Sequence, residues 1–496
     1  MKSSKIHFPF RGVAAYIIIF VLCVAAVPST AQTYTTLVTF DVTNGANPYF
    51  GPLVQGRDGN LYGTTEGGGA NSAGTVFKMT LDGTLTPLYS FCAQLNCADG
   101  EDPVAGLVLG TDGNFYGTTL SGGGFGNCSS TGCGTIFKIS PTGNLSTIHS
   151  FGSLPGDGFQ PVAGLVQGNN GSFYGTTGEG FDGTFFRISS SGTFKELHDF
   201  YPPEGIFPWT GPTLGSDGSF YGTTVGGGTS SACNDGCGTV YKIKPTGKLT
   251  TLHSFGLADG ASPYSGTVQA SDGNFYGTTT LGGINPNSCT FVVASEACGT
   301  IFQITATGQL TSLYYFCSVG ICLDGLDAFG TLIQATDGNL YGTTVQGGLF
   351  TLGVLFQVTT SGSFQVLHNF DRDNGGNPSA GLVQATNGKL YGTTFYGGSS
   401  QNCPYGCGSI YSLDLGLSPF VEALTYSGKV GKTIEFLGQG FTKSSTVAFN
   451  GVTAKASIKS GTYLTAKVPV GATTGYVTIT TANGTLTSNK EFNVVP

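Results

Sequence analysis

Carboxylates in recurring polar segments are the side chains of this chain that could take part in catalysis. Two of them, if they converged, could act as the acid and base of a glycoside hydrolase. The candidates are Asp99, Glu101, Asp102, Asp157, Glu204, Asp259, Asp324, Asp327, Asp371 and Asp373. Their spacing along the chain does not tell which of them meet. An extracellular polysaccharide-active enzyme, a lyase or a glycoside hydrolase, is therefore one alternative.

Histidines offer less for catalysis, because they share one equivalent position of a recurring apolar segment. The four beyond residue 31 are His149, His198, His253 and His368, and Tyr89 and Tyr314 stand at the same position in two other copies. Interchange with Tyr indicates an amphipathic packing position on an outer strand. We therefore expect no catalytic residue among them.

Three aromatic residues are candidates for ligand binding. Tyr49, Trp209 and Tyr264 occupy the same position in the segments "PYFG", "PWTG" and "PYSG". Exposed rings at the mouth of a channel could stack on sugar faces, and packing between repeats is the alternative. Trp209, the only Trp, is the first choice for a binding residue.

Cysteine spacing predicts a set of local disulfides. The twelve cysteines beyond Cys23 fall into six pairs that are close in sequence: Cys92 and Cys97, Cys128 and Cys133, Cys233 and Cys237, Cys289 and Cys298, Cys317 and Cys322, Cys403 and Cys407. An even count in local pairs is typical of an exported chain. A zinc site would need a His or a second Cys pair nearby in sequence, and none is present. We expect no metal and no cofactor.

The elements that must position these residues come from a repeat. The sequence "YGTT" begins at seven positions: Tyr62, Tyr116, Tyr174, Tyr221, Tyr276, Tyr341 and Tyr391. Around each copy four short apolar segments follow one another, as at 106–110, 115–119, 134–140 and 145–151. Abundant Gly, Thr and aromatic residues with only 10% charged residues favour short strands and tight turns. This is the pattern of an all-β fold, a β-propeller with four strands per blade.

An Asp-Gly pair precedes most copies of "YGTT" and is predicted to form a hairpin turn. Asp stands there in five copies, at Asp58, Asp112, Asp217, Asp272 and Asp337, and Asn170 and Asn387 take its place in the other two. Asn tolerates the left-handed backbone of a turn as well as Asp does but ligates a cation less strongly. The pair therefore indicates a structural turn and not a repeated cation site.

The order of the segments predicts a closed ring. A fourth-type segment at 34–40 comes before any other segment, and the last repeat, which ends at 408–414, lacks one. Seven complete blades result only if the N-terminal strand completes the final blade, which also removes an open sheet edge. The repeats at 32–416 are therefore expected to form a seven-bladed propeller.

The repeated phrase resembles a known family. "GLVxGxDGNFYGTTxxGG…GTxFKIxxxGxLTxLHSF" is similar to the tandem repeat called Gloeo/Verruco, or GloVer, found in exported bacterial proteins. The resemblance covers about residues 32–416 and implies little about activity. More faintly, the "DGN(L/F)" core resembles virginiamycin B lyase-like propellers, but no His falls in the segments expected at the channel mouth.

The last 80 residues have a different pattern. Segments at 431–441, 445–452, 464–469, 475–484 and 488–495 alternate apolar and polar residues across turns, which predicts a small β-sandwich. The motif G-x-T-x-x-x-x-G-x-G-F from Gly431 resembles the IPT/TIG immunoglobulin-like domain. That resemblance, over 417–496, implies a spacer or an interaction module.

The N-terminus predicts export. Lys2, Lys5 and Arg11 precede an apolar run at 13–27, and the small residues of "PSTAQ" follow, so residues 1–31 are interpreted as a secretory signal peptide cleaved after Ala31. The net charge of -8 with only 20 Lys and Arg argues against nucleic acid. We expect a secreted monomer without a membrane span once the signal is removed. Its predicted role is non-catalytic binding of polysaccharide or a surface protein, and the alternatives are the enzyme above or a structural envelope or adhesion component.

Overall fold

The computed structural model describes residues 32–124, 128, 132–153, 156–178, 182–283 and 298–495, all within one compact unit, Gln32–Pro496. The predicted signal segment 1–31 and Cys289 lie outside the described residues. Strands make up the described chain, and its one helical element is the 3-10 turn η1 (Leu95–Cys97). No helix in these ranges is long and apolar enough to cross a membrane.

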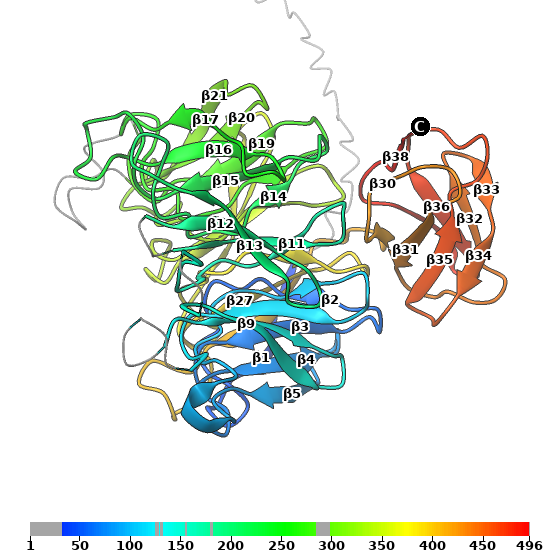
Figure 1. Ribbon diagram of the computed structural model, residues 1–496, viewed down its shortest axis with the longest axis horizontal. Coiled ribbons are helices and arrows are strands. Elements are labelled where there is room, and N and C mark those ends of the chain that lie inside the picture. The colour runs from blue at the N-terminus through cyan, green and yellow to red at the C-terminus, as the bar shows by residue number, and fades with distance from the viewer. Residues whose placement is uncertain are drawn as a thin grey trace, which may run out of the picture. The chain divides into compact units, whose positions relative to one another are not determined.

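The repeats form four-stranded antiparallel sheets, as in the blades of a β-propeller (Figure 1). Within the described residues, the first six repeats contribute four consecutive strands each. These are β2 (Val54–Gln55), β3 (Leu61–Thr65), β4 (Thr75–Met79) and β5 (Leu85–Ser90); β6 (Val108–Leu109), β7 (Phe115–Thr119), β8 (Thr135–Ile139) and β9 (Leu145–Ser150); β10 (Val166–Gln167), β11 (Phe173–Thr177), β12 (Thr184–Ile188) and β13 (Phe194–Asp199); β14 (Thr213–Leu214), β15 (Phe220–Thr224), β16 (Thr239–Ile243) and β17 (Leu249–Ser254); β18 (Val268–Gln269), β19 (Phe275–Thr278), β20 (Thr300–Ile304) and β21 (Leu310–Tyr315); β22 (Ile333–Gln334), β23 (Leu340–Thr344), β24 (Val354–Val358) and β25 (Phe364–Asn369).

A seventh sheet joins the two ends of the repeat region. Its order is β1 (Thr33–Thr39), β28 (Ser409–Asp414), β27 (Leu390–Thr394) and β26 (Val383–Gln384). In Figure 1 the blue β1 lies in the same part of the fold as β27. β1 runs antiparallel to β28, with Thr33 opposite Asp414 and Thr39 opposite Ser409. The N-terminal strand thus supplies the fourth position of the last repeat, as its sequence predicts.

A turn with Asp-Gly or Asn-Gly precedes the "YGTT" strand in every repeat. Gly59 has φ +82° and Gly113 has φ +83°, the left-handed backbone that such a turn requires. The preceding Asp112 accepts a hydrogen bond from the Asn114 amide at 3.1 Å and another from the Tyr116 hydroxyl at 2.8 Å. In the two copies with Asn, the side-chain amide donates instead, as Asn387 does to the Tyr391 hydroxyl at 2.8 Å. The turn residue therefore anchors the buried Tyr of "YGTT", and the structural interpretation of the motif is confirmed.

The anchored tyrosines make stability sensitive to alkaline pH. Burial and the hydrogen bond to Asp112 raise the pKa of Tyr116 to about 12, although Lys138 lowers it, and burial with an Asp partner raises the pKa of Tyr62, Tyr276 and Tyr341 as well. Phenols of an unfolded chain ionise near pH 10. The stability that these groups contribute is therefore complete below about pH 10 and is lost as the pH rises above it.

We expect the free energy of unfolding to fall steeply above about pH 10, with phenolate absorbance appearing together with unfolding. Urea denaturation at a series of pH values, followed by ultraviolet absorbance, measures both. Tyr116→Phe removes one such phenol and should make the decline shallower. A folded protein whose phenols all titrate near pH 10 would contradict this.

The C-terminal region is a sandwich of two four-stranded sheets. One has the order β29 (Glu422–Ala423), β31 (Thr433–Leu437), β35 (Tyr463–Lys467), β34 (Ala456–Ile458), and the other β33 (Val452–Ala454), β32 (Thr446–Phe449), β36 (Val477–Thr481), β37 (Gly484–Thr487). A short parallel pair, β30 (Ser427–Gly428) and β38 (Asn493–Val494), completes it. Phe436, Phe449, Leu464 and Ile479 from both sheets meet in one core. This agrees with the predicted β-sandwich.

Candidate functional site

Two classes of loop meet at one end of the sheets. One class follows the fourth strand of a repeat, and the other follows the "YGTT" strand of the next. Isolated bridges join them, for example Glu101 with Ser121 and Ile206 with Gly226. Among the described residues, the disulfides all lie in these loops: Cys92–Cys97, Cys128–Cys133, Cys233–Cys237, Cys317–Cys322 and Cys403–Cys407. These five predicted pairs are confirmed, and the sixth involves Cys289, which is not described.

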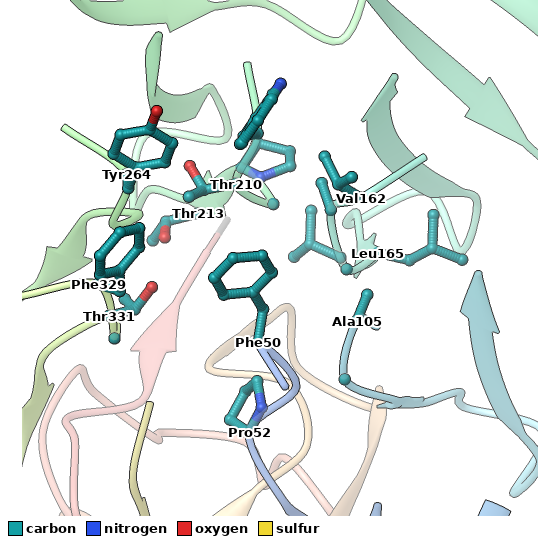
Figure 2. A pocket seen from close by; sticks show the side chains of 18 of the residues that line it. Phe50, Pro52, Ala105, Val162, Leu165, Thr210, Thr213, Tyr264, Phe329 and Thr331 are labelled. Atoms are coloured by element: carbon teal, nitrogen blue, oxygen red, sulfur yellow. The ribbon is translucent and has the colours of Figure 1, made fainter. Parts of the chain in front are cut away.

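A cavity of about 420 Å³ is lined by residues from all seven repeats. Figure 2 shows Phe50 pointing into its middle, with Tyr264 and Phe329 on one side and Val162 and Leu165 on the other. The lining residues lie on the segments that lead into the first strands and on those strands themselves. The side-chain polar groups of the lining residues are the hydroxyl groups of Thr210, Thr213, Thr331, Ser379 and Tyr264 and the indole N–H of Trp209. The described lining contains no charged side chain.

Two of the three aromatic candidates line this cavity. The ring centroids of Trp209 and Tyr264 are 5.4 Å apart in an edge-to-face contact, and Tyr264 lies 5.0 Å from Phe329. Tyr49 is not among the lining residues; it stacks on Phe50, with 3.8 Å between the ring centroids. The alternative of packing between repeats therefore holds in part, since Trp209 and Tyr264 come from adjacent repeats and touch each other.

Phe50 and Phe329 are the functional candidates that the sequence analysis missed. Each stands directly before a glycine, Gly51 or Gly330. This is the position that follows the one occupied by Tyr49, Trp209 and Tyr264 in their repeats. Both rings are half-buried, and their centroids are 6.1 Å apart. Comparing this neighbouring position across the repeats, where small residues otherwise prevail, could have identified them.

The indole N–H of Trp209 is buried and lacks a hydrogen-bond partner among the described residues. A buried donor without a partner costs about 1–3 kcal/mol. The position thus tolerates a cost to stability that a purely apolar ring would avoid.

Most of the candidate carboxylates are held by their own loops, away from the cavity. Asp99 accepts hydrogen bonds from the Tyr89 hydroxyl at 2.8 Å and from the amide of Ala93 at 2.9 Å. Asp324 accepts one from the Tyr314 hydroxyl at 2.7 Å. In three of the four copies with His, the ring takes the same place, in the pairs His149 with Asp157, His198 with Glu204 and His253 with Asp259. The fourth, His368, differs, because its Nε2 is buried and has no hydrogen-bond partner among the described residues. Asp371 binds its neighbour Asn374.

The shared position of His and Tyr therefore has a second role beside packing. The rings do pack, as when His149 stacks on Phe194 with 4.1 Å between centroids. In all the copies with His or Tyr except that of His368, the ring also contacts the carboxylate of the following loop, so a ring nitrogen and a phenol can fill the same role. The prediction of a packing position is incomplete, because it left out this partner.

Asp102 is an acidic residue whose charge acts on two other carboxyls, those of Glu66 and Glu101. Burial, and then the charge of Asp102, raise the pKa of Glu66 and that of Glu101. Burial also raises the pKa of Asp102. Asp327 stands apart, with burial raising its pKa to about 6, and Asp373 is exposed. None of these five lines the cavity.

Comparison with known proteins places the chain in a family and a fold. A model described as the Gloeobacter/Verrucomicrobia repeat matches residues 23–182, 127–316 and 288–464. No curated protein matches the sequence. A fungal alcohol oxidase of the AA5 family, solved with copper, is similar with a TM-score of 0.50 and 13% identity, covering 94% of this chain and 100% of its own.

A second solved structure is the extracellular domain of a protein described as a hybrid two-component system from B. thetaiotaomicron. It has a TM-score of 0.48 and 9% identity, and the match covers 94% of this chain and 60% of that one. At such identities the likeness of the oxidase shows a shared fold alone, and no activity follows from either protein.

Proposed function

The chain belongs to the Gloeobacter/Verrucomicrobia repeat family, and from the site in its repeats we propose that it is an exported, non-catalytic protein that binds polysaccharide. The cavity of about 420 Å³, lined by aromatic rings and hydroxyl groups, carries this proposal. Its volume lies in the range of small-molecule sites, about 300–1,000 Å³. Rings and hydroxyls without charges suit a neutral sugar, which offers apolar faces and hydroxyl groups.

The same proposal includes the architecture that presents the site. The seven sheets form a closed seven-bladed propeller, 32–416, with β1 completing the last blade, and residues 417–496 form an IPT/TIG domain that acts as a spacer or interaction module. The pairing of β1 with β28 supports closure. The disulfides and the signal-like residues 1–31 support secretion to the cell surface, the periplasm or the medium.

The test is binding of neutral oligosaccharides to the chain that starts at Gln32. A glycan array identifies ligands, and calorimetry with cellohexaose, xylohexaose, mannohexaose and laminarihexaose gives affinities. We expect Trp209→Ala to weaken binding about 10- to 100-fold, as loss of a central aromatic contact does elsewhere. Phe350→Ala, which removes an exposed ring outside the cavity, should leave affinity unchanged.

Two outcomes would count against the proposal. An array without any glycan bound, together with a protein partner recovered by pull-down, would favour adhesion or envelope assembly. If wild type and Trp209→Ala bound the same oligosaccharide with equal affinity, the binding site would lie outside the cavity.

A polysaccharide-active enzyme is the second candidate, and the acidic group around Asp102 favours it. The charge of Asp102 contributes to the raised pKa of Glu66, and a carboxyl with a raised pKa is what a lyase or glycoside hydrolase needs for its general acid. Release of new reducing ends or of unsaturated products, abolished by Asp102→Asn, would establish it. The absence of any product from glycans that the array shows to bind would leave the binding role.

A further inference from the structure

A second, smaller cavity lies among the loops of the last two repeats. It measures about 190 Å³ and is lined by the side chains of Leu352, Arg372, Asn377, Tyr396 and Tyr405. Tyr405 stands inside the short loop that the Cys403–Cys407 disulfide closes. We call this cavity the rim pocket. It combines a cation, two phenols and one aliphatic side chain, a composition unlike that of the central cavity.

Arg372 gives the rim pocket its charge. Its guanidinium lies over the Tyr405 ring, 5.6 Å from the ring centroid, and the residue is exposed. Among the described residues, the Arg372 side chain takes part in no hydrogen bond or ion pair, so its N–H donors are free to bind a carboxylate in a bidentate manner. Asp371, next in the chain, is engaged with Asn374.

The fold itself does not require these side chains, as the fourth repeat shows. There Cys233–Cys237 closes a loop with the same sequence separation, 4, and the same Cα–Cα distance, 5.2 Å, as Cys403–Cys407. The same backbone hydrogen bonds recur: the Gly227 amide donates to Asp235 at 2.6 Å, and the Gly397 amide donates to Tyr405 at 2.8 Å.

The two loops differ in the side chains that give the rim pocket its charge and its phenols. The Gly228 amide donates to the Pro202 carbonyl at 2.7 Å where the Gly398 amide donates to that of Arg372 at 3.0 Å. Arg372, Tyr396 and Tyr405 thus correspond to Pro202, Gly226 and Asp235. The same backbone conformation accommodates both sets of side chains. Folding therefore does not require Arg372, Tyr396 and Tyr405, which suggests a role for them in binding.

A row of rings connects the rim pocket with the central cavity. From Phe50 the contacts pass to Tyr49 at 3.8 Å between centroids, to Phe395 at 4.9 Å and to Tyr396 at 4.6 Å, and they end at Tyr405 at 5.7 Å. None of these five rings is buried, whereas the tyrosines of "YGTT" are. Aromatic faces that reach solvent in a continuous row can contact successive units of one extended ligand.

We propose that the rim pocket binds the carboxylate of a uronic acid unit belonging to an oligosaccharide whose neutral part lies in the central cavity. This inference rests on the proposed function. The Arg372 guanidinium receives the carboxylate, and the Tyr405 and Tyr396 rings contact the sugar ring. A single negative charge fits best, because Asp371 and Asp373 flank Arg372 and the chain carries a net charge of -8. Groups of higher charge meet more repulsion at one isolated cation.

The experiment compares two matched ligands by calorimetry at low salt: hexagalacturonic acid and its carboxyl-reduced, neutral counterpart. We expect wild type to prefer the acidic ligand, and Arg372→Gln to lower affinity for it about tenfold or more while affinity for the neutral one is unchanged. Tyr405→Asp, which installs the residue of the fourth-repeat loop, should act likewise and retain the fold. Lys248→Gln removes an exposed charge from a turn between β16 and β17 and should alter neither affinity.

The outcomes separate this inference from the proposed function. If Arg372→Gln leaves the affinity for the acidic ligand unchanged while Trp209→Ala weakens both ligands, the rim pocket is refuted and the central site stands. If wild type binds both ligands equally, the rim pocket is likewise refuted. If wild type binds neither of these ligands nor any glycan of the array, both proposals fall together.

Discussion

Deletion of residues 32–40 is expected to abolish cooperative folding and to cause aggregation. β28 would lose the partner that it meets from Thr33 opposite Asp414 to Thr39 opposite Ser409. Phe40, which has no exposed surface, would be lost from the core of the first and last repeats. An unpaired strand edge presents free N–H and C=O groups to other chains.

Size-exclusion chromatography with light scattering and calorimetric melting measure this effect, with the chain starting at Gln32 as the reference. A graded version is Phe40→Ala, expected to cost about 3–5 kcal/mol. Phe255→Ala, the equivalent Phe of an internal repeat, is the matched control and should cost a similar amount without aggregation. A truncated chain that stayed monomeric and melted in one transition near the reference temperature would disprove the role of β1.

Gly260→Ala is expected to be among the most destabilising single substitutions in the repeats, at about 2–5 kcal/mol. Gly260 has φ +130°, and a Cβ there would lie 2.6 Å from Oγ1 of Thr279 and 2.9 Å from Oγ1 of Thr300. Those two hydroxyls are hydrogen-bonded to each other at 3.0 Å and are buried. The added methyl group would therefore push apart the pair that joins the two middle strands of the sheet.

Gly273→Ala in the same repeat separates backbone strain from close packing. Gly273 has φ +84°, but a Cβ there meets nothing within 4 Å, so only the strain of about 1–2 kcal/mol applies. Urea denaturation of both variants gives the difference. Thr279→Ala should recover part of the loss in the Gly260→Ala background, a coupling that a double-mutant cycle detects. Equal losses in the two glycine variants would show that contact with Thr279 is unimportant.

Local features of this protein could be read from its sequence because each depends on neighbours along the chain. The Asp112 side chain and the positive φ of Gly113 act within one turn, and Cys233 bonds to Cys237 four residues away. The pairing of β1 with β28 was predictable for another reason. Repetition shows which segment is missing from the last repeat, so a counting argument replaces knowledge of distant contacts.

The central glycine of "YGTT" shows where such reasoning ends. Glycine weakens a strand, and nothing near Gly117 in the sequence explains why one is needed there. In the folded protein, a Cβ at Gly117 would lie 2.5 Å from the ring of Phe137 on the adjacent strand. The requirement arises from a cross-strand contact that repetition marks but does not explain.

The repeats, the turns, the local disulfides and the strand that completes the last sheet were thus predictable, since spacing or repetition encodes each of them. Which side chains meet in a cavity, by contrast, depends on tertiary packing. It brought Phe50 and Phe329 to the cavity, left Tyr49 beside it and used Asp99 and Asp324 to anchor loops. It also set Arg372 over Tyr405. These contacts join residues of different segments whose separation follows no fixed period, so their geometry exists only once the sheets have packed.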